Sequence, residues 1–162
     1  HFMQAQQLLH YWQKLEKRPA GKWLFSKVIQ HKAPFFKTSN AQIVELRPNY
    51  AKLMVKKRHA VQNHIGTVHV IAICNMLEMA MGALAEVSIP NHLRWIPKGM
   101  SVEYTAKAGS DITGIAEVKS EDWQAGDLDV VVNAYDNQGV VVVKGVIKLW
   151  ISEKPNKKPL NP

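Results

Sequence analysis

The chain has 162 residues, of which 46% are hydrophobic and 21% charged, and its formal net charge is +8. This length and composition fit a single folded domain and exclude a largely disordered chain. Cys74 is the only cysteine, so an internal disulfide is excluded and the reducing cytoplasm is the expected location. The positive charge raises the question of nucleic-acid binding. However, the one dense basic group before the C-terminal end, Lys52, Lys56, Lys57 and Arg58, accompanies no binding motif, so a solvated face or a rim for an anionic ligand is favoured.

The N-terminal part is predicted to be helical. Apolar residues recur at helical spacing over residues 4–17 and again over residues 22–30. Residues 19–21, Pro-Ala-Gly, separate the two helices, and Pro34 is expected to end the helical region. Residues 1–40 are therefore interpreted as an N-terminal helical extension.

The pattern changes from residue 41 onward. Residues 41–46 and 52–56 alternate between apolar and polar side chains, as half-buried strands do. Arg47-Pro48-Asn49 lies between them and supplies a turn. The two segments are therefore predicted to form a β-hairpin.

A long apolar segment follows, over residues 68–87. Between His69 and Glu86 its only strongly polar residues are Asn75 and Glu78, and its alanines, methionines and leucines favour a helix. A helix that is apolar nearly all round either spans a membrane or is buried in protein. A carboxylate in mid-span is costly in lipid, and strands flank the segment, so a buried helix is expected.

The remainder is predicted to be β. Four strands are expected, over residues 102–108, 115–119, 128–135 and 140–151, with a turn at Asp136-Asn137-Gln138-Gly139 before the last. A curved antiparallel sheet of about six strands wrapped around the apolar helix gives both elements a buried face. The predicted class is α+β. Residues 41–152 form the sheet-and-helix unit, and residues 153–162 form a loose tail within a single domain overall.

Glu78 is the residue most suggestive of chemistry. A lone carboxylate in an apolar helix is costly unless it is paired, hydrogen-bonded or used, and burial would raise its pKa and prepare it as a general base. A purely structural glutamate is the alternative. Asn75, Glu78 and Gly82 share one helix face. Gly82 either leaves room for a ligand or permits close packing.

The polar loop before the helix is the second candidate. Residues 63–69 read Asn-His-Ile-Gly-Thr-Val-His, and the free N–H groups of a first helical turn can form an oxyanion hole. Thr67 could instead serve only as the N-cap. His69 and Glu78 are nine positions apart and point to opposite faces, so His69 is interpreted as an anchor for the loop rather than as the partner of Glu78. No metal-ligand spacing is present.

These residues resemble the hotdog-fold acyl-CoA thioesterases, in particular the phenylacetyl-CoA thioesterase-like branch and its uncharacterised relatives. The shared pattern is Asn63, then Gly-Thr-Val-His over residues 66–69, then Glu78 on the central helix. The run over residues 93–100 also resembles the segment that follows the helix in this family. The likeness covers about residues 41–151 and implies a hotdog fold.

The resemblance also implies catalytic roles. Glu78 would be the general base or the nucleophile. The N–H of Val70, one residue past His69, would polarise the thioester carbonyl. Asn63 would orient the thioester or the attacking water. In this family the sites lie between subunits, which implies a homodimer or a dimer of dimers. Many relatives have glycine where this chain has Val70, and the β-branched side chain narrows the approach to the N–H.

The expected substrate is an acyl-CoA, with no cofactor, no metal, no membrane span and no nucleic-acid partner. A non-catalytic acyl-CoA or acyl-chain binding protein on the same fold is the alternative, and nucleic-acid binding is a more distant one. The candidate substrate-binding residues are Gly66, Thr67, Asn75, Gly82, Arg58, Arg94 and Lys98, of which the last three are candidates for the nucleotide phosphates.

Overall fold

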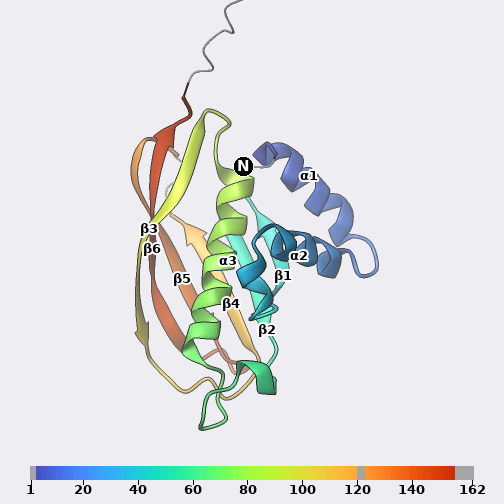
Figure 1. Cartoon of the computed structure of the whole chain (residues 1–162), viewed down its shortest axis with the longest axis vertical. Coiled ribbons are helices and arrows are strands. Elements are labelled where there is room, and N and C mark those ends of the chain that lie inside the picture. The colour runs from blue at the N-terminus through green and yellow to red at the C-terminus, as the bar shows by residue number, and fades with distance from the viewer. Residues whose placement is uncertain (1–2, 120–122, 156–162) are drawn as a thin grey trace, which may run out of the picture.

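The structure, a computed structural model, describes residues 3–119 and 123–155 (Figure 1). Six strands form one antiparallel sheet in the order β1-β2-β4-β5-β6-β3, with a long helix, α3, on one face and shorter helices beside it (Figure 1). The helices are α1 (Ala5–Glu16), α2 (Gly21–Lys32) and α3 (Val70–Ser88), with 3-10 turns η1 (Pro34–Lys37) and η2 (His59–Val61). The strands are β1 (Gln42–Arg47), β2 (Tyr50–Val55), β3 (Leu93–Tyr104), β4 (Ile112–Val118), β5 (Gly126–Tyr135) and β6 (Val141–Glu153).

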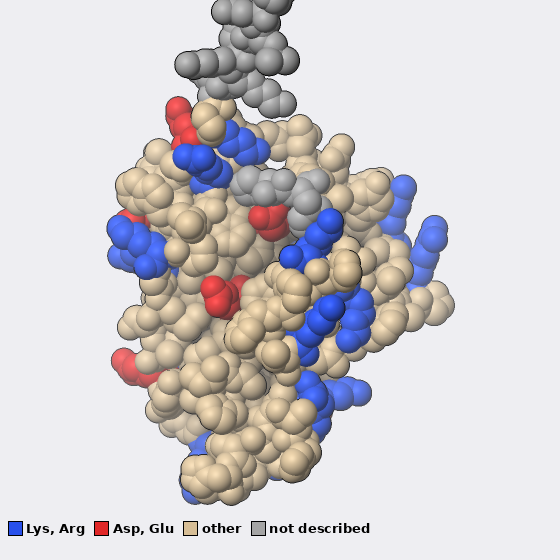
Figure 2. All heavy atoms as spheres, in the orientation of Figure 1, with Lys and Arg blue, Asp and Glu red and all other residues tan. Residues whose placement is uncertain are grey.

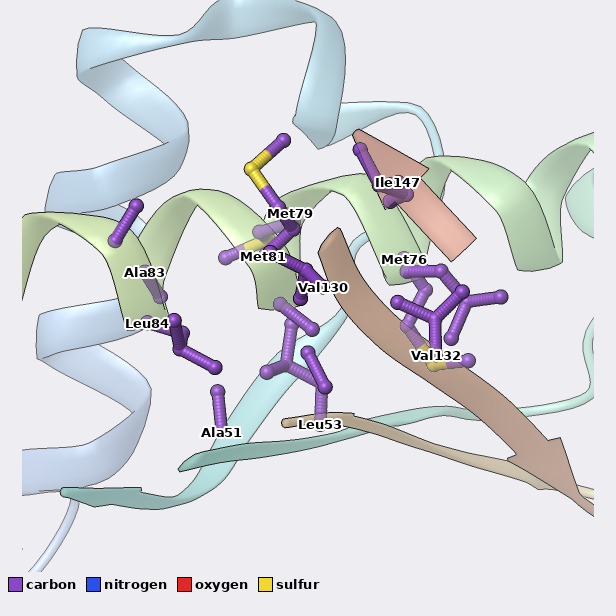
Figure 3. Close-up of a cluster of buried hydrophobic side chains, with 14 of the residues drawn as sticks. Ala51, Leu53, Met76, Met79, Met81, Ala83, Leu84, Val130, Val132 and Ile147 are labelled. Carbon is purple, nitrogen blue, oxygen red and sulfur yellow. The ribbon is translucent and has the colours of Figure 1, made fainter. Parts of the chain in front are cut away.

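The central helix forms the middle of the core. α3 packs on β1, β2, β4 and β5, and Met76 and Leu84 point from it toward the strands in Figure 3. Its mean hydropathy of 1.6 would suit a membrane span, but 61% of its most apolar window is buried within this chain. The prediction of a core helix is confirmed on the side that faces the sheet. On the outward side it is not fully met, because Ile71 is 56% exposed and Glu78 is only half-buried.

Both predicted turns are confirmed. β1 and β2 pair antiparallel, and the turn between them places Asn49 at φ +66°, a left-handed conformation that asparagine tolerates. Between β5 and β6, Asp136 Oδ1 accepts hydrogen bonds from the N–H groups of Gln138 and Val140, both at 2.9 Å. Gly139 completes this turn at φ +78°.

The strand after α3 starts earlier than predicted. The alternation suggested a strand over residues 102–108, whereas β3 runs from Leu93 to Tyr104 and residues 105–108 lie beyond its end. Pro97 and Gly99 obscured the first half in the sequence. Both are tolerated because β3 is the last strand in the sheet order and its pairing with β6 has a register shift between them.

The N-terminal helices pack against the sheet-and-helix unit. Trp12 of α1 is fully buried and makes an edge contact with Phe25 of α2, at 5.2 Å between ring centroids. The buried Gln30 donates from Nε2 to the carbonyl of Ala41 at 2.8 Å. Pro34 begins η1 rather than ending the helical region, because a proline at the first position of a helical turn costs no hydrogen bond.

The predicted loose tail is outside the described residues from 156 onward. Its first residue, Glu153, still belongs to β6 and pairs with Leu93 of β3.

Candidate functional site

His69, rather than Thr67, caps the N-terminus of α3. Its Nδ1 accepts a hydrogen bond from the N–H of Ile71 at 3.1 Å, and its own N–H donates to the carbonyl of Val61 at 2.7 Å. The cap by Thr67 that the sequence left open is therefore wrong, since the helix begins two residues later than that cap requires. His69 is fixed by these two bonds at the boundary between loop and helix, as expected for an anchor of the loop.

The loop before α3 is held by Asn63. The Oδ1 atom of Asn63 accepts from the N–H groups of Ile65 and Thr67, both at 3.1 Å, and Nδ2 donates to Thr67 Oγ1 at 2.7 Å. Gly66 has φ +79°, a conformation that favours glycine. Asn63, Gly66 and Thr67 thus form one closed turn that sets where the helix starts.

The first residue of α3 presents a free donor. The N–H of Val70 has no hydrogen-bond partner among the residues that the structure describes. A hollow of about 340 Å³ lies beside it, and its lining includes Asn63, His69 and Val70 together with Tyr104 and Lys107. Because N–H groups at a helix start carry partial positive charge, this position suits the developing negative charge of a carbonyl oxygen.

Glu78 lies two turns further along α3. It is half-buried, and no hydrogen bond or ion pair reaches its carboxylate from residues 3–119 or 123–155. Cys74 is one turn before it, and burial together with the charge of Glu78 raises the pKa of the Cys74 thiol. The eight residues from Val70 to Glu78 correspond to about 12 Å along the helix axis, too far for both groups of one chain to act on one carbonyl.

The other two predicted positions on this helix differ in their surroundings. Asn75 is buried, accepts from Ser39 Oγ at 2.7 Å through Oδ1, and donates through Nδ2 to the Phe35 carbonyl at 3.3 Å and to Thr38 Oγ1 at 3.2 Å. It therefore joins α3 to η1 and the residues that follow it. Gly82 is half-buried, and a Cβ added there would meet only the ring of Trp95, at 3.8 Å.

The three basic candidates do not gather within one chain. Arg58 donates to the carbonyls of Thr38 and Ser39, at 3.2 and 3.4 Å, on the side of the molecule that carries η1. Arg94 and Lys98 lie on β3. Arg94 donates to Ser152 Oγ at 3.1 Å, and Lys98 forms an ion pair with Asp127 at 3.0 Å. In Figure 2 the basic side chains gather instead over the N-terminal helices.

A further group of residues was not predicted. An apolar cavity of about 210 Å³ lies between part of α3 and the segment that holds α2 and η1, and Phe36, Met79 and Trp95 are among the residues that line it. Trp95 Nε1 donates to Glu86 Oε1 at 2.9 Å, and burial raises the pKa of Glu86 despite the opposing effect of that bond. Within the described ranges, no group of three or more His, Cys, Asp or Glu side chains could hold a metal ion.

Comparison with solved structures identifies the fold. A structural-genomics protein (APC5556) is 43% identical, covering 93% of this chain and 98% of its own, with a TM-score of 0.78. A protein of unknown function from Pseudomonas aeruginosa is 23% identical, covering 85% of this chain and 97% of its own, with a TM-score of 0.72. A thioesterase family protein from Silicibacter pomeroyi is 18% identical, covering 80% of this chain and 96% of its own, with a TM-score of 0.68.

The fold is thus the hotdog fold, as the resemblance predicted. Residues 21–151 match the family described as Domain of unknown function (DUF4442), and the chain belongs to this family. No curated protein is similar enough in sequence to count as a match.

Proposed function

We propose that the protein hydrolyses an acyl-CoA thioester to the free acid and coenzyme A. The observation that carries this proposal is a pair of groups on α3 that have no hydrogen-bond or ion-pair partner among the described residues: the N–H of Val70 at its start and the carboxylate of Glu78 on its outward face. One is an oxyanion donor and the other a general base or nucleophile. The hotdog thioesterases among the similar structures support the same class of reaction.

The two groups would act together in a homodimer. Because about 12 Å separates them along one helix, Val70 of one subunit would serve Glu78 of the other. β3 is an edge strand with exposed Ile96 (60%), Met100 (40%) and Tyr104 (62%), and the outward face of α3 exposes Ile71. An exposed apolar edge and an incompletely covered helix are the surfaces that a second copy, or a dimer of dimers, would bury.

The reaction follows from these positions. In the general-base route Glu78 takes a proton from water, and the resulting hydroxide attacks the thioester carbon while the N–H of Val70 stabilises the oxyanion. Collapse of this intermediate expels the coenzyme A thiolate, which takes the proton from Glu78. In the alternative route Glu78 attacks the carbon itself and expels the coenzyme A thiolate, which leaves a mixed anhydride on Glu78. Water then hydrolyses the anhydride, which releases the free acid, restores the Glu78 carboxylate and supplies the proton that the thiolate takes up. Asn63 orients the loop that presents the donor.

Binding of coenzyme A would use basic side chains around this site. Arg58, Arg94 and Lys98 remain the proposed contacts for the phosphates, and they would have to come from both subunits, since one chain places Arg58 and β3 apart. A cytoplasmic location also remains a prediction, in keeping with the single thiol, Cys74.

The decisive variants are Glu78→Gln and Val70→Pro. Val70 is the first residue of α3, where proline is tolerated, and His69 has φ −62° and ψ 131°, which suits a residue before proline. Val70→Pro thus deletes one N–H with little change to the helix, and Val70→Ala is its matched control. Release of free thiol from acyl-CoAs of several chain lengths should fall by about 10²–10⁴-fold in Glu78→Gln and about 10²–10³-fold in Val70→Pro.

The Val70→Ala control separates loss of the N–H from loss of the side chain. Val70→Ala should keep most of the activity because its N–H remains. If wild type releases no thiol from any acyl-CoA yet is stabilised against heat by them, the protein is a binding protein and the proposal fails. Full activity in Glu78→Gln would remove Glu78 from the mechanism.

A further inference from the structure

The apolar cavity beside Gly82 offers a place for one half of the proposed substrate. It lies between the N-terminal extension, which contributes Ile29, Ala33 and Phe36, and the adjoining side of α3, which contributes the buried residues Met79 and Ala83. In Figure 3 Met79 points from α3 toward the N-terminal helices, whereas Met76 points toward the sheet. The cavity is thus separate from the packed core and from the hollow beside Val70.

The position of the cavity relative to Glu78 is suited to an acyl chain. Gly82 is one turn after Glu78 on the same side of α3, about 6 Å along the axis. Gly82 lines the cavity and carries no side chain, and the only group near the position of a Cβ there is the Trp95 ring, at 3.8 Å, so the helix surface between Glu78 and the cavity is not blocked at this position. A chain that leaves a thioester carbon at Glu78 would therefore enter the cavity past Gly82.

Trp95 closes the cavity on the side of β3. Its six-membered ring lies over Gly82, and its Nε1 donates to Glu86 Oε1, one turn further along α3, at 2.9 Å. The indole ring is therefore held by this hydrogen bond at Glu86 and by its contact with α3 at Gly82. Glu86 is accordingly a positioning residue for Trp95, and Trp95 limits the space available to a ligand.

We infer that this cavity holds the acyl chain of the substrate and that Trp95, held by Glu86, restricts the substrate to short and medium apolar acyl groups. The inference rests on the proposed function. Its volume of about 210 Å³ is below the roughly 300–1,000 Å³ of sites for drug-sized ligands. Apart from Lys32 and Glu86, its lining is apolar or glycine, as burial of hydrocarbon requires.

The experiment is a chain-length profile from two to sixteen carbons of acyl-CoA, measured as kcat/KM for wild type and three variants. Gly82→Val blocks the entrance, and Ala33→Leu fills the cavity from the opposite wall. Each should lower the ratio of kcat/KM for the eight-carbon substrate to kcat/KM for the two-carbon substrate by about tenfold or more. The reason is that only the longer chain loses methylene contacts when the cavity is filled or blocked. Trp95→Ala should move the optimum to longer chains, and Trp95→Phe should move it less.

The outcomes separate this inference from the proposed function. If wild type hydrolyses acyl-CoAs and all folded variants keep its profile, the cavity is not the acyl site, while the hydrolase remains. If wild type hydrolyses no acyl-CoA, the proposed function fails, and calorimetric binding of non-hydrolysable thioether analogues decides the inference about the cavity. The inference is supported if wild type prefers certain chain lengths and Gly82→Val and Ala33→Leu weaken this preference. Equal binding of all chain lengths overturns it. Thermal melting of each variant identifies any that does not fold. If either Gly82→Val or Ala33→Leu fails to fold, the chain-length profile of the other variant decides the inference.

Discussion

The two sides of α3 contrast sharply, although they belong to one continuous apolar helix. Toward the sheet, Met76, Leu77 and Leu84 have no exposed surface. Figure 3 shows Met76 and Leu84 directed at strands of the same chain. On the outward side Ile71 is 56% exposed, and Glu78 is half-buried. The first side is complete within one chain. The second has apolar and acidic groups that one chain does not cover, which is the property expected of a surface that meets ligand and partner.

The largest expected effect is a loss of stability when a side chain on the sheet-facing side of α3 is truncated. Leu77→Ala should lower the free energy of unfolding by about 2–5 kcal/mol, because it leaves a cavity among buried strands. Ile71→Ala, at a protein concentration low enough for single chains, should change it by only about 0.5 kcal/mol. Urea unfolding measures both. Equal losses in the two variants would show that the outward side is as fully packed as the inner one.

A second expected effect concerns the boundary between the two sides, where Asn75 joins α3 to η1. Asn75→Ala removes three hydrogen bonds and leaves the buried Ser39 hydroxyl with only the longer bond to the Phe36 carbonyl, at 3.4 Å, which should cost about 1–3 kcal/mol of stability. Ser39→Ala is the matched variant on the other side of the same bond. A fall in kcat/KM for acyl-CoA without a fall in melting temperature would instead assign Asn75 to the substrate.

A third effect tests the exposed edge. Ile96→Lys places a charge on the apolar surface of β3 and should weaken self-association by about tenfold or more, as judged by sedimentation over a range of concentrations. Val140→Lys is the control, because Val140 is also exposed, at 46%, but lies at the turn before β6. Unchanged association in Ile96→Lys, or a loss in both variants, would contradict an interface through β3.

The smallest effect is a pH dependence at Glu86. Burial raises its pKa above the ordinary value of 4.5, so the folded protein binds this proton more tightly than the unfolded chain does. The contribution of Glu86 to stability therefore declines as pH rises through the interval above 4.5. Glu86→Gln lacks this proton equilibrium and still offers an oxygen to Trp95. Its stability relative to wild type should increase from pH 4 to pH 7 in thermal melts, and parallel curves would contradict the pKa shift.

Local patterns predicted the features that depend on neighbouring residues. The apolar composition around Glu78 identified α3, and the turn residues at Asn49 and Gly139 identified both hairpins. The first half of β3 was missed because Pro97 and Gly99 oppose a strand except at a sheet edge, and a sequence without its fold does not show where an edge is. The cap by His69 was missed because threonine is the commoner cap.

Features that depend on distant residues were beyond the sequence. Asn75 as a substrate contact stays a prediction, but its hydrogen bonds to residues 36 or more positions away, in and after η1, could not be predicted from the sequence. The cavity was not predicted either, since it requires Phe36 of the extension and Trp95 of β3 to meet across α3. The N-terminal helices had no match in the family resemblance, so nothing in the sequence linked them to the site.

The central claim is that each active site joins Glu78 of one subunit to the Val70 N–H of the other. Glu78→Gln and Val70→Pro chains, each nearly inactive alone, can be co-expressed with different tags, and the mixed dimers isolated. Each mixed dimer would hold one intact site and one doubly defective site, so it should recover about half of the wild-type thioesterase activity per dimer. Mixed dimers as inactive as either parent would contradict the intersubunit site.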